Sequence, residues 1–190
     1  MILELQNIAT QRIAAIDSNN DKLTYAEITQ LSQQISTNIP ERALCFLLVE
    51  NNVGGIAWTI GMLESRKLVP LILNVKTEES LYQQLLDTYK PSYICAPTHV
   101  TLEGEIVDSQ LGYQLCKVSD NLCILHPDLS HLLPTSGSTG SPKLVRHKYE
   151  NIEAAGLNIS TFFELKETDR PLMVLPLYYT MGLSMIFSHL

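Results

Sequence analysis

Apolar residues along the first hundred positions follow two alternating patterns. Continuous apolar runs at Ala43–Val49, Leu68–Val75 and Ser92–Ala96 are typical of strands that are covered on both faces. Before and between these runs, apolar residues recur at helical spacing. The inner faces of the three predicted helices comprise Ile28, Leu31, Ile35 and Ile39, then Ile56, Ile60 and Leu63, then Leu81, Leu85, Leu86 and Tyr89. This half of the chain therefore predicts helices that alternate with strands.

Polar residues and prolines mark the ends of two of these helices. Thr24 and Glu27 have the spacing of a capping box, in which each side chain bonds to the backbone amide of the other residue. Pro40 ends that helix. Thr77 is expected to cap the third helix, which Pro91 ends.

The second half of the chain is less regular. Short strands are predicted at Tyr113–Val118 and Leu122–Leu125, and on either side of a polar loop at His131–Leu133 and Leu144–Val145. The last stretch, Thr180–Leu190, begins like a helix.

Successive strand–helix units predict an α/β fold, with a largely parallel sheet and helices on both faces. No internal repeat, low-complexity tract or Gly/Pro/Ser-rich linker divides the chain, so we expect a single domain over residues 1–190. In such sheets, ligands bind beyond the carboxyl ends of the strands.

Composition narrows the possible partners. The formal net charge is −7 and the 13 Lys and Arg residues are scattered, which argues against nucleic acid as a partner. The longest uncharged apolar stretch, Val53–Leu63, falls short of the ~20 residues that a membrane helix needs. The N-terminus lacks a basic segment followed by an apolar one. We therefore expect a cytoplasmic protein that does not bind membranes.

Cysteine and histidine spacing gives no sign of a metal site. The cysteines stand singly in apolar runs, without Cys-x-x-Cys spacing, and are expected to be reduced, buried thiols. They are Cys45, Cys95, Cys116 and Cys123. Trp58 is expected in the core. His147 is expected to point outward from its strand, with Arg146 and Lys148 solvated beside it.

One segment carries candidate chemistry. Thr135, Ser136, Gly137, Ser138, Thr139, Gly140 and Ser141 form a run of small residues, followed by Pro142 and Lys143. Such a loop is rich in amide and hydroxyl donors, its glycines allow close backbone approach, and the lysine adds a point charge. These are the parts needed to bind a polyphosphate.

Two common nucleotide motifs do not match this loop. In a Walker motif that starts at Gly137, the second glycine would fall on Pro142, and Leu144 follows the lysine where Ser or Thr is required. The dinucleotide fingerprint needs three glycines, and only Gly137 and Gly140 are near.

The loop resembles the phosphate loop of the adenylate-forming superfamily, which includes acyl-CoA synthetases and the adenylation domains of nonribosomal peptide synthetases. Residues Thr135–Lys143 fit its Thr/Ser-Ser-Gly-Ser/Thr-Thr-Gly-x-Pro-Lys pattern, and Leu144 replaces the usual glycine. Three other segments are similar to family segments in the same order: Leu23–Glu27, Gly61–Leu71, in which Lys67 replaces a usual glycine, and Leu175–Gly182.

The resemblance implies a fold and a two-step reaction. The fold would be the N-terminal subdomain of the adenylate-forming ligases. A carboxylic acid would attack the α-phosphate of ATP, bound with Mg²⁺, to give acyl-AMP and pyrophosphate. The acyl group would then pass to the thiol of CoA or of carrier-protein pantetheine.

The same resemblance assigns roles to residues. Thr135, Ser136, Ser138 and Thr139 would donate hydroxyls to ATP, with Gly137 and Gly140 giving backbone access. Lys143 would be the catalytic cation on the β- and γ-phosphates. Tyr178, Tyr179 and Gly182 would lie near the acid pocket, although many members have His where Tyr179 stands.

Other interpretations stay open. The family's later segments, which bind adenine, ribose and Mg²⁺ and carry a catalytic lysine, are not in this sequence, so we expect an N-terminal fragment that is inactive alone. The alternative is a non-catalytic scaffold or nucleotide-binding module that keeps the fold. Lys143 could also be a solvated residue after a turn, and Tyr178 and Tyr179 could serve packing alone.

Overall fold

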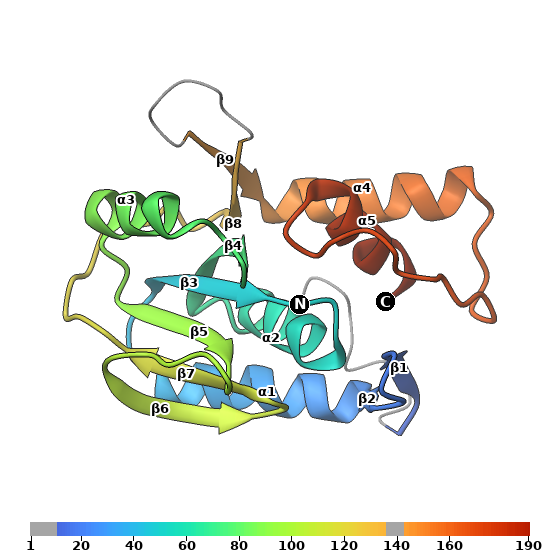
Figure 1. Cartoon of the computed structure of the whole chain (residues 1–190). Helices are drawn as coiled ribbons and strands as arrows, with labels where there is room; N and C mark the ends of the chain where they lie inside the picture. The colour runs from blue at the N-terminus through green and yellow to red at the C-terminus, as the bar shows by residue number, and fades with distance from the viewer. Residues whose placement is uncertain (1–10, 136–142) are drawn as a thin grey trace.

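The computed structural model describes residues 11–135 and 143–190. The strands are β1 (Ile13–Ile16), β2 (Lys22–Thr24), β3 (Ala43–Val49), β4 (Leu68–Asn74), β5 (Tyr93–Pro97), β6 (Glu105–Gln110), β7 (Tyr113–Lys117), β8 (Leu129–Pro134) and β9 (Leu144–Lys148). The helices are α1 (Tyr25–Asn38), α2 (Val53–Ser65), α3 (Glu79–Tyr89), α4 (Tyr149–Phe162) and α5 (Thr180–His189). Their arrangement is drawn in Figure 1.

A mixed sheet in the order β6-β7-β5-β3-β4-β8-β9 forms the centre of the molecule. Strands β5, β3, β4 and β8 run parallel to one another, whereas β7, β6 and β9 extend the two edges in antiparallel pairing. The prediction of a largely parallel α/β sheet is thus confirmed at the sheet's centre. Strands β1 and β2 form a separate antiparallel pair.

Helices cover both faces of the sheet, as predicted. Alternate residues of β3 enter two different cores: Cys45 and Leu47 pack on the side of α1, α2, α4 and α5, and Phe46 packs on the side of α3. This explains why β3 is a continuous apolar run, because both faces of a central parallel strand are covered. Trp58 lies in the first core with no exposed surface, as predicted.

The capping box at the start of α1 is confirmed. The Glu27 amide donates to Thr24 Oγ1 at 3.2 Å, and the Thr24 amide donates to Glu27 Oε2 at 2.7 Å. The predicted cap of α3 is wrong, because Glu78 occupies the N-cap without a side-chain bond. The Thr77 hydroxyl instead donates to the carbonyl of Asn74, 2.6 Å away, at the end of β4.

The predicted strand at Leu122–Leu125 is also wrong, since this segment has no strand pairing. Its upstream neighbour Asn121 is bound to the turn between α3 and β5, where its Nδ2 donates to the Lys90 carbonyl at 2.8 Å and its own carbonyl accepts from the Ser92 hydroxyl. Ile124 is left fully exposed.

The cysteines are free thiols. Cys45, Cys95 and Cys116 are buried, as predicted, and Cys123 is half-buried. Burial raises the pKa of the Cys45 and Cys95 thiols well above the ordinary value. Within the described ranges, no helix combines the length and apolar character needed to cross a membrane.

Candidate functional site

The carboxyl ends of β3, β4 and β8 meet at one edge of the sheet, because these strands are parallel neighbours. Leu71 of β4 pairs with Leu132 of β8, so Asn74 at the end of β4 and Thr135 after β8 are equally far along their strands. This is the edge where open α/β sheets bind ligands.

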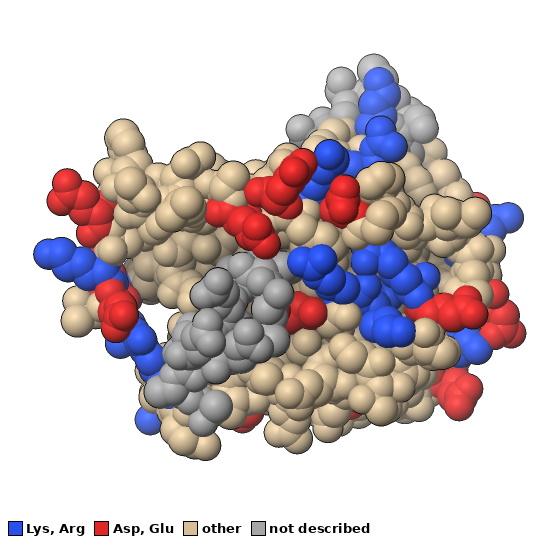
Figure 2. All heavy atoms as spheres, turned by 180° about the vertical axis from the view of Figure 1, so that it is seen from behind, with Lys and Arg blue, Asp and Glu red and all other residues tan. Residues whose placement is uncertain are grey.

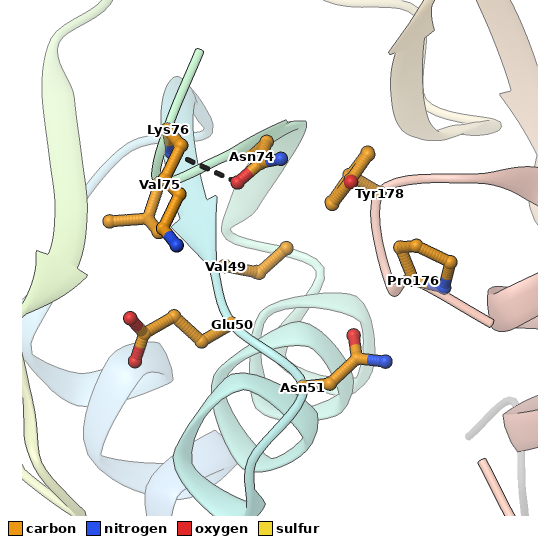
Figure 3. A pocket seen from close by; sticks show the side chains of 8 residues that line it. All are labelled: Val49, Glu50, Asn51, Asn74, Val75, Lys76, Pro176 and Tyr178. Carbon is orange, nitrogen blue, oxygen red and sulfur yellow. Dashed lines mark hydrogen bonds between the residues drawn. The ribbon is translucent and has the colours of Figure 1, made fainter. Parts of the chain in front are cut away.

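A hollow of about 290 Å³ lies at this edge. Residues from the ends of two strands line it, together with two residues that precede α5 (Figure 3): Val49, Glu50, Asn51, Asn74, Val75, Lys76, Pro176 and Tyr178. Pro176 and Tyr178 face Glu50, Val75 and Lys76 across the hollow. The lining of the hollow therefore contains one cation, one carboxylate, two amide side chains and one aromatic ring: Lys76, Glu50, Asn51, Asn74 and Tyr178.

The predicted phosphate loop begins and ends on the paired strands β8 and β9. Pro134 pairs with Leu144, and the Thr135 amide donates to the Lys143 carbonyl at 2.9 Å. The ends of the loop, Thr135 and Lys143, thus lie side by side and are exposed. The other predicted loop residues, Ser136, Gly137, Ser138, Thr139 and Gly140, lie outside the described residues.

The segment around the two predicted tyrosines is held against the carboxyl end of β3. Asn51 Nδ2 donates to the Leu175 carbonyl at 3.0 Å, and the Leu177 amide donates to Asn51 Oδ1 at 2.9 Å. Tyr178 borders the hollow. Tyr179 does not border it, has 56% of its surface exposed, and is the N-cap of α5.

Gly182 packs closely against the backbone of the same segment. A Cβ at this position would lie 2.1 Å from the Pro176 carbonyl oxygen and 3.0 Å from that of Leu175. Only glycine permits this approach of α5 to the segment that carries Tyr178. The structure therefore places Gly182 behind the segment, as a residue that allows it to pack.

A polar network fixes the turn between β3 and α2. The Glu50 amide donates to the Tyr113 hydroxyl at 3.0 Å, and Asn52 Oδ1 caps α2 by accepting from the Gly55 amide at 2.8 Å. Burial raises the pKa of Tyr113, so its hydroxyl stays protonated at neutral pH. The Glu50 side chain has a further neighbour, because His99 Nε2 lies 3.7 Å from Glu50 Oε1.

Sequence reasoning missed Asn51, Asn74 and Lys76. The available signal was their position, since each lies at the end of a buried parallel strand or within two residues of it. The partners of Asn51 could not be identified in this way, because they are more than 120 residues away.

His147 does not point outward, and the prediction is wrong. Its ring stacks on that of His131, its pairing partner on β8, with ring centroids 4.4 Å apart and planes 3° apart. His131 is only 2% exposed, and burial together with the adjacent His147 lowers its pKa to about 3. Burial lowers the pKa of His147 as well.

The hydroxyl of Ser130 links the two strands beside this histidine pair. Ser130 Oγ donates to the His147 carbonyl at 2.8 Å, and it lies 3.1 Å from His131 Nδ1. With its proton at the carbonyl, Ser130 Oγ is left as an acceptor for an N–H at His131 Nδ1. Burial thus disfavours the charged form of both histidines, which lie on the two strands that support the loop.

Basic side chains gather over the middle of the reverse side of the molecule, with acidic side chains close by (Figure 2). Two arginines at the amino ends of strands serve packing: Arg42 and Arg66 lie 6.0 Å and 4.5 Å from the centre of the Tyr149 ring. Arg42 also donates to the carbonyls of Arg66 and Leu129. These cations lie at the edge of the sheet opposite the hollow.

A second cavity of about 900 Å³ lies between β1, the segment 165–173 and the end of α5. None of Thr135, Lys143, Tyr178, Tyr179 and Gly182 lines it. Of these five residues, Tyr178 lines the hollow at the carboxyl edge of the sheet.

Comparison with known proteins identifies the family. The sequence model of the AMP-binding enzyme family matches residues 64–190, which is more than half of the chain and includes the predicted loop. No curated protein matches the chain.

Several solved structures share the fold. The o-succinylbenzoate CoA synthetase (MenE) of Bacillus subtilis, in complex with AMP, has a TM-score of 0.71 and 19% identity, over 98% of this chain and 52% of that one. MatB of Rhodopseudomonas palustris has a TM-score of 0.73 and 17% identity, over 99% and 43%. The NpsA N-terminal subdomain of Klebsiella oxytoca has a TM-score of 0.72 and 18% identity, over 98% and 50%.

The chain thus spans about half the length of the structures it resembles. Its fold is that of the N-terminal subdomain of adenylate-forming ligases, and the family match covers both the predicted loop and the segment before α5. The chain belongs to the AMP-binding enzyme family.

Proposed function

We propose that this chain is the N-terminal part of an AMP-forming ligase that activates a carboxylic acid and passes it to a thiol. The observation that carries the proposal is the family match over the loop, whose two ends the β8–β9 pair brings together at the carboxyl edge of the sheet. In the proposed reaction, the acid attacks the α-phosphate of ATP and pyrophosphate leaves. The acyl group then moves from AMP to the sulfur of CoA or of carrier-protein pantetheine.

Lys143 and the loop would act on the leaving pyrophosphate. Phosphoryl and adenylyl transfer depend mainly on positioning and on neutralising charge at the phosphate oxygens. Lys143 is proposed to balance charge on the β- and γ-phosphates, while Thr135, Ser136, Ser138 and Thr139 donate hydroxyls and Gly137 and Gly140 expose amides. The loop starts and ends on hydrogen-bonded strands, which supports a fixed position for both Thr135 and Lys143.

Tyr178, Tyr179 and Gly182 are proposed to shape the acid site from the other side. Tyr178 borders the hollow, Tyr179 caps α5, and Gly182 lets α5 pack closely on the Leu175–Pro176 backbone. Magnesium would come with ATP, as in the Bacillus subtilis MenE complex that contains both. In residues 11–135 and 143–190, no group of three or more His, Cys, Asp or Glu side chains could hold a metal ion. We therefore assign no metal ligand.

The parts that bind adenine and ribose and transfer the acyl group are proposed to lie outside these 190 residues. The support is that the chain spans only about half of the structures it resembles. A chain without those parts would bind phosphate but would not complete the reaction. The alternative, a non-catalytic module, is supported by the closed core, which buries apolar side chains on both faces of the sheet.

Exchange of labelled pyrophosphate into ATP tests the proposed function. Trial acids are o-succinylbenzoate, acetate, benzoate and the amino acids, added to the product of the whole reading frame that encodes these residues. We expect acid-dependent exchange by that product and none by the 190 residues alone. Exchange by the 190 residues alone would contradict the proposal that essential parts of the site lie outside them. If the product of the whole reading frame showed no acid-dependent exchange, the alternative of a non-catalytic module would be favoured.

A further inference from the structure

One side chain connects the end of β3 to the segment that borders the hollow. Asn51 uses both atoms of its amide: Nδ2 donates to the Leu175 carbonyl at 3.0 Å, and Oδ1 accepts from the Leu177 amide at 2.9 Å. The two bonds reach alternate residues of an irregular segment. The Leu175–Leu177 segment is not in a strand, and the two bonds of Asn51 attach its backbone to the end of β3.

Asn51 is itself held firmly. It lies two residues after Val49, the end of β3, and directly before Asn52, whose side chain caps α2. The segment it binds is also fixed from behind, because Leu177 is fully buried and Gly182 contacts the Pro176 carbonyl. Figure 3 shows Asn51 on the same side of the hollow as Pro176.

We infer that Asn51 is a positioning residue of the acid site, which fixes the backbone of Leu175–Leu177 so that Tyr178 borders the hollow. The bond pattern requires a side chain with one donor and one acceptor at the same reach, which is the property of a carboxamide. Alanine makes neither bond, and aspartate keeps only the acceptor. The role in acid binding rests on the proposed function, whereas the attachment of the segment does not.

Hydrogen exchange at the Leu177 amide tests the attachment in the 190-residue chain. In Asn51→Ala this amide loses its acceptor, and we expect its exchange to accelerate by about tenfold or more. Asn51→Asp keeps an oxygen acceptor, so exchange should stay within about threefold of the original. Asn121→Ala is the matched control, because it removes an amide side chain that donates to the Lys90 carbonyl and leaves both Asn51 bonds in place.

Steady-state kinetics test the link to the acid in the product of the whole reading frame. We expect Asn51→Ala to raise the KM for the acid about tenfold and to leave the KM for ATP within about twofold, with Asn51→Asp between the two. Asn121→Ala should change the ratio of the two KM values by less than about twofold.

Failure of the Asn51 inference can be distinguished from failure of the proposed function. Unchanged Leu177 exchange in Asn51→Ala, or an equal rise in both KM values, would overturn the inference. An original product without acid-dependent exchange would contradict the proposed function, and the Leu177 measurement would still decide whether Asn51 holds the segment.

Discussion

Replacing Gly182 with alanine is expected to lower the free energy of unfolding by about 3 kcal/mol. The added Cβ would lie 2.1 Å from the Pro176 carbonyl oxygen, a backbone atom that cannot turn aside. Either α5 or the Leu175–Pro176 backbone must move, and Gly182 is buried, so there is little room for the shift. Urea denaturation of the 190-residue chain measures the loss.

Ser184→Ala is the matched control on the same helix. The Ser184 hydroxyl donates to the Thr180 carbonyl one turn earlier, and its replacement should change stability by less than about 0.5 kcal/mol. If Gly182→Ala were as stable as Ser184→Ala, the close packing of α5 on this segment would be refuted.

Acid is expected to destabilise the protein through the stacked histidines. An unfolded histidine takes up a proton near pH 6.5, whereas His131 in the folded chain stays neutral down to about pH 3. Between these values the unfolded state binds more protons, so stability is complete above about pH 6.5 and decreases as the pH falls. The loss from His131 alone should reach about 2 kcal/mol between pH 7 and pH 5.

Urea denaturation at pH 7, 6 and 5 measures this dependence. His131→Phe keeps a flat ring beside His147 and Phe187 but cannot take up a proton, so it should lose about 1 kcal/mol or less over the same interval. His99→Gln, at an exposed histidine, should behave like the original chain. Equal losses in His131→Phe and the original chain would contradict the role of the pair.

The sequence predicts the centre of this fold better than its edges. Strand β3 is recognisable because both of its faces are buried, which produces an unbroken apolar run. Strand β6 has one neighbour and a mostly exposed, polar sequence, so no apolar pattern reveals it. Helix α4 leaves Leu157 and Phe162 exposed, which obscures the apolar stripe expected of a surface helix.

The candidate site likewise contains some residues that the sequence reveals and others that it does not. Thr135 and Lys143 are found from the loop motif, since a motif is a property of adjacent residues. The contact of Asn51 with Leu177 and the stacking of His147 on His131 depend on partners that are distant along the chain. Alternation along one strand gives the face on which a side chain lies, but it does not reveal which side chain of the paired strand lies beside it.

Titration of the 190-residue chain with ATP and with pyrophosphate tests most directly whether the loop between β8 and β9 binds phosphate. We predict that both ligands bind and that Lys143→Ala weakens each by about tenfold, the value of one charged contact of about 1.4 kcal/mol. The matched control is Lys90→Ala, at the opposite edge of the sheet, which should leave both affinities within about twofold. Equal affinity in the original chain and Lys143→Ala, or no binding of either ligand, would contradict this account.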